Sequence, residues 1–236
     1  MLSRVLFVVG FLASFQCFSL NGDDVKMLDR SYPQHCTDVN KTHHRDSFYV
    51  IQPEFADRPF QVKCDLEHDG GGWTVIMNRD PKGSSFARDW DSFEFGFGDL
   101  RKEFWLGLEN IYQLAGYSMN ELHIELVDQG HVTKYIRYQN FMIGNRASYY
   151  DLHMLTGYNE GDGNPSDPMK FYIGMKFGTE DKHELECEDY VEKWGWWGPG
   201  CGPDSLTGNC IGLSTSTVTC SLAVTMKIRP SPSKES

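Results

Sequence analysis

The side chains best suited to hold a metal ion form a short acidic run near the C-terminal end. This run, Glu180-Asp181-Lys182-His183-Glu184-Leu185-Glu186, ends at Cys187. Clustered carboxylate oxygens in a short loop are ligands that calcium prefers. A charged loop exposed to solvent is the simpler interpretation, and we favour it over a metal site.

The sequence contains none of the common catalytic motifs that its histidines and serines could form. The chain has eight histidines, but no His-Glu-x-x-His, Gly-x-Ser-x-Gly or phosphate-loop motif. His43 and His44 are adjacent in a polar stretch, which favours a solvated pair over a metal site. His123 stands alone in an alternating stretch and is expected to be structural. We therefore expect a binding protein, not an enzyme.

A secretory signal peptide is predicted over residues 1–19. A basic residue near the start is followed by an apolar stretch, Val5 to Phe15. The small residues Cys17 and Ser19 precede the expected cleavage before Leu20. A membrane anchor is the alternative, but the stretch is shorter than the ~20 residues that span a bilayer. We therefore expect a secreted, extracellular protein.

Charge and cysteine content fit this compartment. Without the signal peptide the chain keeps 21 basic and 33 acidic residues, and six of its seven cysteines. Nucleic acids and anionic membranes are bound through an excess of basic residues, so neither is an expected partner. Six cysteines in an exported chain are more often paired than free. The sequon Asn40-Lys41-Thr42 makes Asn40 the expected glycosylation site.

The mature chain divides into a disordered stub over residues 20–31, one domain over residues 32–230 and a tail over residues 231–236. Alternation and turn signals predict the following strands: Phe48–Ile51, Phe60–Lys63, Trp73–Asn78, Glu121–Val127, Lys134–Tyr138, Phe141–Ile143, Tyr149–Leu152 and Ser221–Ile228. Loops are expected at residues 81–85 and 158–169.

One long helix is predicted over Leu100 to Gly116. Its apolar residues Phe104, Leu108, Ile111 and Ala115 follow a 4-3-4 spacing, and Gly116 fits a C-cap. Strands, one helix and then an antiparallel meander indicate an α+β fold.

Three runs rich in glycine and aromatic residues are the most distinctive feature of the sequence. They are Cys64 to Ile76 with its triple glycine, Phe104 to Leu108, and Trp194 to Cys201. Consecutive glycines suit a backbone that passes close to another element. In this order, with Cys36 ahead of them, the runs resemble the fibrinogen C-terminal domain family. The resemblance covers about Tyr32 to Pro230.

The resemblance implies a small disulfide-linked N-terminal lobe, a central twisted antiparallel sheet with helices and a loop-rich C-terminal lobe. It also implies the disulfides Cys36–Cys64 and Cys187–Cys201. Two cysteines then remain, and their proximity in the sequence suggests a third disulfide, Cys210–Cys220. Without that bond they would be reactive or intermolecular thiols.

Family members carry their calcium loop in the acidic run. The two aspartate ligands of the family correspond here to Thr179 and Asp181, so one of the two is replaced. Lys182 stands beside the remaining one, and the loop is shorter than in the family. We expect a weak calcium site at most, with Asp181 as its main ligand and Glu180 and Glu184 as substitutes.

The expected ligand pocket also departs from the family. Gly202 stands in place of a histidine and Thr207 in place of an asparagine, whereas Leu206 is retained. Trp196 and Trp197 could form the walls of a small slot for an acetyl group. Packing of both tryptophans in the core is the alternative, because large aromatic residues usually serve that role.

Two functions remain open. The first is lectin-like recognition of carbohydrate or acetylated groups on a microbial or cell surface, as in innate immunity. The second is a protein-binding module, such as a receptor ligand or secreted interaction protein, with degenerate sugar and calcium sites. The residues ahead of Tyr32 hold no heptads and no Gly-X-Y repeats. A lectin would therefore need self-association or a partner for avidity.

Overall fold

The structure, a computed structural model, describes residues 32–39, 47–80, 86–128, 130–160, 167–182, 195–198 and 221–232. The chain forms two compact units, residues 1–31 and 32–236, and the described residues all belong to the second. Within them, no helix is long and apolar enough to cross a membrane.

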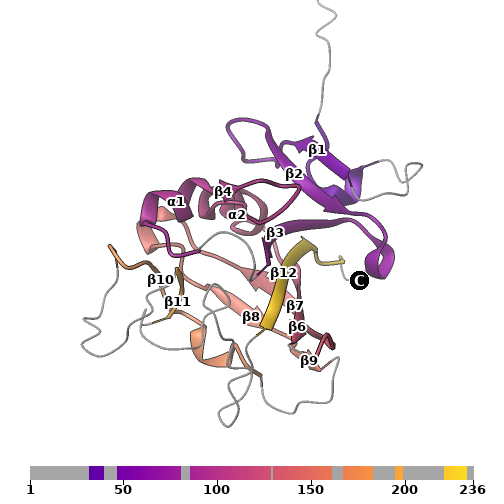
Figure 1. Cartoon of the computed structure of the whole chain (residues 1–236). Helices are drawn as coiled ribbons and strands as arrows, with labels where there is room; N and C mark the ends of the chain where they lie inside the picture. Colours follow the sequence, from indigo (N-terminus) through magenta and orange to yellow (C-terminus); the bar gives the residue numbers. More distant parts are fainter. Residues whose placement is uncertain are drawn as a thin grey trace, which may run out of the picture. The chain divides into compact units, whose positions relative to one another are not determined.

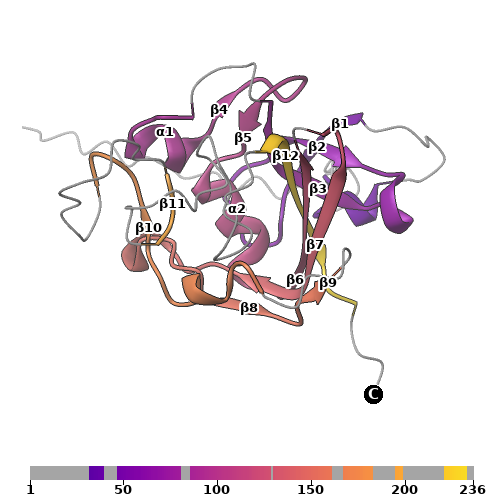
Figure 2. The same cartoon turned by 60° about the horizontal axis from the view of Figure 1, so that its bottom comes forward.

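A ten-stranded antiparallel sheet is the framework of the second unit (Figure 1). Its main path runs β1-β2-β3-β12-β6-β7-β8. These strands are β1 (Ser47–Ile51), β2 (Phe60–Asp65), β3 (Trp73–Arg79), β12 (Ser221–Pro230), β6 (Asn120–Asp128), β7 (Thr133–Met142) and β8 (Met154–Thr156). The strand nearest the C-terminus, β12, lies between β3 and β6 (Figure 2). The centre of the sheet therefore joins segments that are far apart in the sequence.

Shorter elements surround this path. The remaining strands are β4 (Phe97–Gly98), β5 (Phe104–Trp105), β9 (Asn159–Glu160), β10 (Phe177–Gly178) and β11 (Trp196–Trp197). The helices are α1 (Trp90–Phe95) and α2 (Leu108–Ala115), with 3-10 turns η1 (Cys36–Asp38), η2 (His68–Gly70), η3 (Arg146–Ser148) and η4 (Lys170–Tyr172). A mostly antiparallel sheet with few helices confirms the α+β prediction.

Sequence alternation locates the main hairpin correctly. Leu122, Ile124 and Leu126 on β6 are all buried, as the pattern of that stretch predicts. Strand β6 pairs with β7 across the expected turn, with Ile124 opposite Ile136. The predicted strands at the N-terminal end and at Trp73 are also confirmed.

The predicted helix over Leu100 to Gly116 is wrong in its first half. Helix α2 begins at Leu108 and ends at Ala115, with Gly116 as its C-cap. Phe104 and Trp105 form strand β5 instead, and they pair with β3 and β4. Gly107, with φ of 101°, separates the two elements. Pairing with distant strands has overridden a local helical spacing at this point.

The predicted strand Tyr149–Leu152 is also wrong. Tyr149 and Tyr150 both have left-handed backbone conformations, with φ of 57° and 49°. A strand cannot contain such residues, and the strand of this region is β8, two residues further on. The expected strand at Phe141 is the end of β7.

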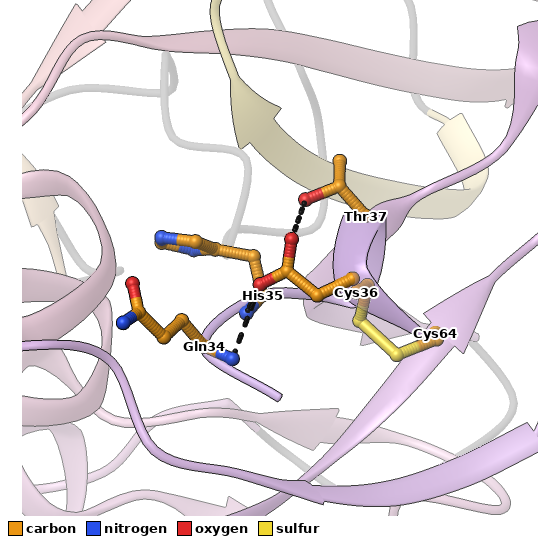
Figure 3. The surroundings of a disulfide bond; sticks show 6 residues. Gln34, His35, Cys36, Thr37 and Cys64 are labelled. Carbon is orange, nitrogen blue, oxygen red and sulfur yellow. Dashed lines mark hydrogen bonds between the residues drawn. A yellow bond between two sulfur atoms is a disulfide. The ribbon is translucent and has the colours of Figure 1, made fainter. Parts of the chain in front are cut away.

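The disulfide between Cys36 and Cys64 fastens the N-terminal segment to β2 (Figure 3). Both cysteines are fully buried, and η1 supplies Cys36. The carboxylate of Asp38 fixes this turn by accepting hydrogen bonds from the backbone N–H of Gln34 and of His35, at 3.1 and 3.0 Å. The first of the expected disulfides is thus present, and it links this lobe to the main sheet.

The triple glycine is explained by close backbone approach. Residues 69–72 all have positive φ. A Cβ on Gly71 would lie 2.2 Å from the carbonyl oxygen of Leu66, and one on Gly72 would lie 2.8 Å from the side chain of Thr37. A side chain at either position would collide with its neighbour.

Candidate functional site

Trp197, one of the two predicted pocket walls, belongs to the core. It is fully buried, and its ring packs against Phe177, Trp105 and Phe141. Its indole N–H donates to the carbonyl oxygen of Tyr150 at 2.7 Å. The pairing of β11 with β10 brings Trp197 opposite Phe177. Both the face and the edge of this ring are therefore engaged within the protein.

Trp196 is also buried, with 4% of its surface exposed. Its ring lies 5.1 Å from that of Trp197 in an edge-to-face contact. Among the described residues its indole N–H has no hydrogen-bond partner. The two tryptophans thus show the core-packing arrangement that the sequence left as an alternative. Their assignment to a ligand pocket stays a prediction, because the segments on both sides of β11 lie outside the described residues.

Asp181, the predicted calcium ligand, joins its loop to helix α1. Its Oδ1 accepts a hydrogen bond from the backbone N–H of Trp90 at 2.9 Å. That N–H belongs to the first turn of α1 and has no acceptor within the helix. The same oxygen accepts from the hydroxyl of Thr179 at 2.8 Å. Thr179, which stands where the family has its other aspartate, therefore binds the aspartate that remains.

Lys182 extends from the same loop over two aromatic rings. Its Nζ lies 3.9 Å from the ring centre of Trp90 and 5.1 Å from that of Tyr149. Lys176 contributes a second ammonium group, 5.0 Å from the ring of Tyr149. Ammonium groups at these distances are attracted by the negative faces of aromatic rings. A cation supplied by the chain thus lies beside Asp181.

The donors described here fit a calcium ion poorly. Calcium requires six to eight oxygen ligands. In the described part of the chain, no group of three or more His, Cys, Asp or Glu side chains is arranged to hold a metal. Glu180 is exposed, and Glu184 lies outside the described residues. Calcium binding stays a prediction for this loop.

Two carboxylates, those of Glu94 and Glu109, meet at the hydroxyl of Tyr150. Glu94 is buried on α1, and its Oε1 lies 2.9 Å from Nε of Arg146 and 2.9 Å from the hydroxyl of Tyr150. That hydroxyl also lies 2.8 Å from Oε2 of Glu109. Burial, and next the contacts with both glutamates, raise the pKa of Tyr150 well above its usual range. The cluster holds α1, α2 and the left-handed turn at Tyr150 together.

Several predicted site residues lie outside the described part of the chain. They are Asn40, Glu184, Cys187, Cys201, Gly202, Leu206, Thr207, Cys210 and Cys220. The disulfides Cys187–Cys201 and Cys210–Cys220 and the glycan at Asn40 therefore stay predictions.

Reasoning from the sequence did not find several exposed apolar side chains between residues 149 and 173. Phe171 on η4 is 70% exposed and Ile173 is 44% exposed. Tyr149 is also exposed, and it lies against Lys176 and Lys182. No sequence signal separated these residues from the core aromatics.

Comparison with models of known protein families shows to which family the chain belongs. The model of the C-terminal globular domain of fibrinogen beta and gamma chains matches residues 32–227. The chain belongs to this family. The match covers all the described residues up to Lys227, and it confirms the resemblance drawn from the glycine and tryptophan runs.

Curated relatives include angiopoietin-related protein 2 of human and mouse. The human protein is 35% identical over 163 residues, which are 67% of this chain and 32% of the relative. Human fibrinogen C domain-containing protein 1 is 34% identical over 179 residues, 73% of this chain and 39% of the relative. The matched part is therefore about a third of the length of these relatives.

Solved structures of the family have the same fold. The fibrinogen-like globe domain of human ANGPTL2 superposes with a TM-score of 0.75 at 30% identity, over 85% of this chain and all of that domain. A lamprey fibrin D-dimer in complex with the peptide Gly-His-Arg-Pro-amide gives 0.69 at 28% identity, over 94% and 81% of the two chains.

Proposed function

We propose that this chain is a secreted, non-enzymatic fibrinogen-related module that binds an extracellular protein. Secretion is supported by the predicted signal peptide and by the Cys36–Cys64 disulfide, since such bonds persist in oxidising compartments. Similarity to angiopoietin-related proteins supports a protein ligand over a carbohydrate.

The observation that carries the proposal is the packing of the two tryptophans. A sugar or acetyl slot needs aromatic faces that a ligand can reach. Trp196 and Trp197 are 4% and 0% exposed, and Trp197 uses its N–H within the core. Asp181 is likewise engaged at the start of α1. Neither feature supports calcium-dependent sugar recognition.

Exposed apolar and aromatic side chains in this part of the chain suit a protein partner. Phe171 and Ile173 are exposed, and so is Tyr149, whose ring Lys176 contacts. Aromatic side chains often supply most of the binding energy at protein interfaces. The lamprey fibrin D-dimer supports the same conclusion, because that protein is similar in fold to this chain and was solved in complex with a peptide ligand.

Binding of the oxidised, tetramerised protein to cultured animal cells tests the proposal. We expect binding that trypsin treatment of the cells abolishes and that neither N-acetylglucosamine nor EGTA reduces. Phe171→Ser should weaken it about tenfold or more, because loss of an interface aromatic commonly costs more than ~1.4 kcal/mol. Val132→Ser is the matched control, since Val132 is 55% exposed on the β6–β7 connection.

Two results would contradict the proposal. One is binding that N-acetylglucosamine or EGTA removes, which would support the lectin alternative. The other is the absence of any trypsin-sensitive binding by the wild-type protein. If Phe171→Ser binds cells as the wild type does, Phe171 is not part of the binding surface.

A further inference from the structure

Two histidines from distant segments stack on one face of the sheet. His123, on the central strand β6, is fully buried. The ring of His68, from η2, lies 4.7 Å from the ring of His123 and nearly parallel to it. Tyr135 on β7 covers the same pair, with its ring 5.3 Å from that of His123. The stack therefore joins a loop to two strands.

Of the four nitrogens in the two imidazole rings, three have no hydrogen-bond partner among the described residues. These are Nδ1 and Nε2 of His123 and Nε2 of His68, all of them buried. A buried polar atom without a partner is costly, and a buried charged ring without one is costlier. The arrangement is therefore suited to neutral rings.

Positive charges flank the stack on both sides. In the sheet register His123 stands between Lys227 on β12 and Arg137 on β7. The nearby carboxylates are already paired, Asp65 with Lys227 at 2.6 Å and Asp69 with Arg137 at 2.8 Å. Burial lowers the pKa of His123 to about 3, and the charges of Lys227 and Arg137 act in the same direction. Asp69 opposes this change, with a smaller effect.

His68 belongs to the loop of residues 65–72, which other groups fasten to the sheet. The backbone N–H of His68 donates to Asp65, and the indole of Trp73 donates to the carbonyl oxygen of His68. Arg229 on β12 donates to the carbonyl oxygens of Asp69 and Gly71 and forms an ion pair with Glu121 on β6. Asp65 is the last residue of β2 and pairs with Trp73, whereas residues 66–72 lie outside the strand ladders. Residues 66–72 can therefore move without breaking the sheet.

We propose that the stack of His68 on His123 is an acid-sensitive latch. It holds the loop of residues 65–72 against the sheet near neutral pH and releases the loop when a proton binds His123. Opening would expose the face of His123 that His68 now covers, and water could then solvate the charged ring.

Proton linkage gives the size of the effect. In the open form water would reach His123 and its pKa would rise toward the usual 6.5, whereas the closed form resists protonation. Lys227 and Arg137 stay beside it on the intact strands, so 6.5 is the upper limit. The open population therefore rises as pH falls. One such proton gives at most about a 30-fold increase between roughly pH 7.4 and pH 5.

Hydrogen exchange of the full oxidised protein tests the latch. Exchange is measured by mass spectrometry at about pH 7.4 and pH 5, corrected for intrinsic rates. We expect a loss of protection of up to about 30-fold in peptides that cover residues 65–72, with the β6–β12 ladder still protected. His123→Phe keeps an aromatic ring but binds no proton, so this variant should lose most of the pH effect. His68→Phe leaves His123 in place and should keep it.

His153→Gln is the matched control, because His153 is exposed and far along the chain from the stack. This variant should respond to pH as the wild type does. If His123→Phe fails to fold, His123→Gln, which also binds no proton, carries the test. The proposal is overturned if the loop keeps its protection at acidic pH, if the folded His123 variant responds like the wild type, or if the β6–β12 ladder loses protection equally.

Discussion

Individual backbone positions determine how the loop after β2 reaches β3. Gly71 has a φ of 72°, and a Cβ there would overlap the carbonyl of Leu66. Gly174 has a similar φ of 80°, but no heavy atom lies within 4 Å of its Cβ position. Comparing alanine substitutions at these two glycines therefore separates the cost of a left-handed backbone from the cost of a steric collision.

Gly71→Ala should therefore destabilise the protein far more than Gly174→Ala. Both variants place an alanine in the left-handed region, which costs about 1–2 kcal/mol. Only Gly71→Ala adds a collision with backbone, for a total loss of roughly 3 kcal/mol or more. Denaturant unfolding followed by tryptophan fluorescence measures both. Equal losses for the two variants would contradict the close approach at Gly71.

The ion pair between Lys227 and Asp65 is largely buried within the sheet. The two side chains are 3% and 13% exposed, and their atoms lie 2.6 Å apart. Lys227→Met leaves the carboxylate of Asp65 largely buried without its partner, at a cost of roughly 3–5 kcal/mol. The double variant Lys227→Met with Asp65→Asn should recover most of that loss, because asparagine is uncharged and keeps an acceptor oxygen for the backbone N–H groups of Glu67 and His68. A double variant that is no more stable than Lys227→Met would show that the pair itself is required.

This pair also affects stability in acid. Burial favours a higher pKa for Asp65, but the hydrogen bond from Lys227, with those from backbone N–H groups, lowers the pKa below 3.8 overall. Its contribution is thus present above pH 3.8 and is lost as the pH falls through the lower, folded-state value. Acid titration of stability should show this loss in the wild type. Lys227→Met should show less of it.

Among the elements, helix α1 depends on a residue that follows it by 91 positions. Its N-cap is Asp89, and the next N–H is satisfied by Asp181. Lys182, beside Asp181, packs its ammonium on the first residue of the helix, Trp90. The loop and the helix are therefore one structural unit within the described chain.

Asp181→Ala should destabilise the protein by about 1–2 kcal/mol, as loss of a helix cap does. Asp181→Asn keeps an acceptor oxygen and should lose less than half as much. Thermal unfolding in EGTA gives both values, because no calcium is present to add its own effect. A loss that appears only when calcium is added would mean that Asp181 serves as a metal ligand instead.

Elements with a clear local period were predictable from the sequence, and those set by distant contacts were not. Alternation gave β6 and its partner β7, because one face of each strand is buried. The spacing at Phe104 matched a helix, yet Phe104 and Trp105 pair with Met77 and Asn78 on β3. The left-handed turn at Tyr149 and Tyr150 is stabilised by tertiary contacts, such as that of Tyr150 with Glu94. Neither tyrosine carries a turn signal of its own.

The same distinction applies to the candidate site. Sequence identified Trp196, Trp197 and Asp181 as residues of interest, and it named core packing as an alternative for the tryptophans. It did not find the role of Asp181 on α1, since the partner N–H belongs to Trp90. Nor did it find the His68–His123 stack, which requires the pairing of β6 with β12 and β7. Exposure of Phe171 likewise depends on what the tertiary fold leaves uncovered.

For the whole molecule, the Cys36–Cys64 disulfide holds the N-terminal segment on a sheet that is completed by the C-terminal strand. The two cysteines are 28 residues apart. Closing a loop of that length stabilises the folded state by on the order of 3–4 kcal/mol in the chain-entropy model. Replacing both cysteines by alanine should lower stability by about that amount, measured by calorimetry. An unchanged melting temperature would contradict this role.

The most direct test of the proposed function is the melting temperature of the oxidised protein with and without the family's usual ligands. Calorimetry would compare EGTA with about 5 mM calcium, each with and without about 100 mM N-acetylglucosamine. A sugar site with millimolar affinity would add ~2.7 kcal/mol under these conditions, or about 5–10 °C. A protein-binding module with degenerate sites should melt at the same temperature in all four samples. A rise with calcium and a further rise with the sugar would contradict the account and restore the lectin function.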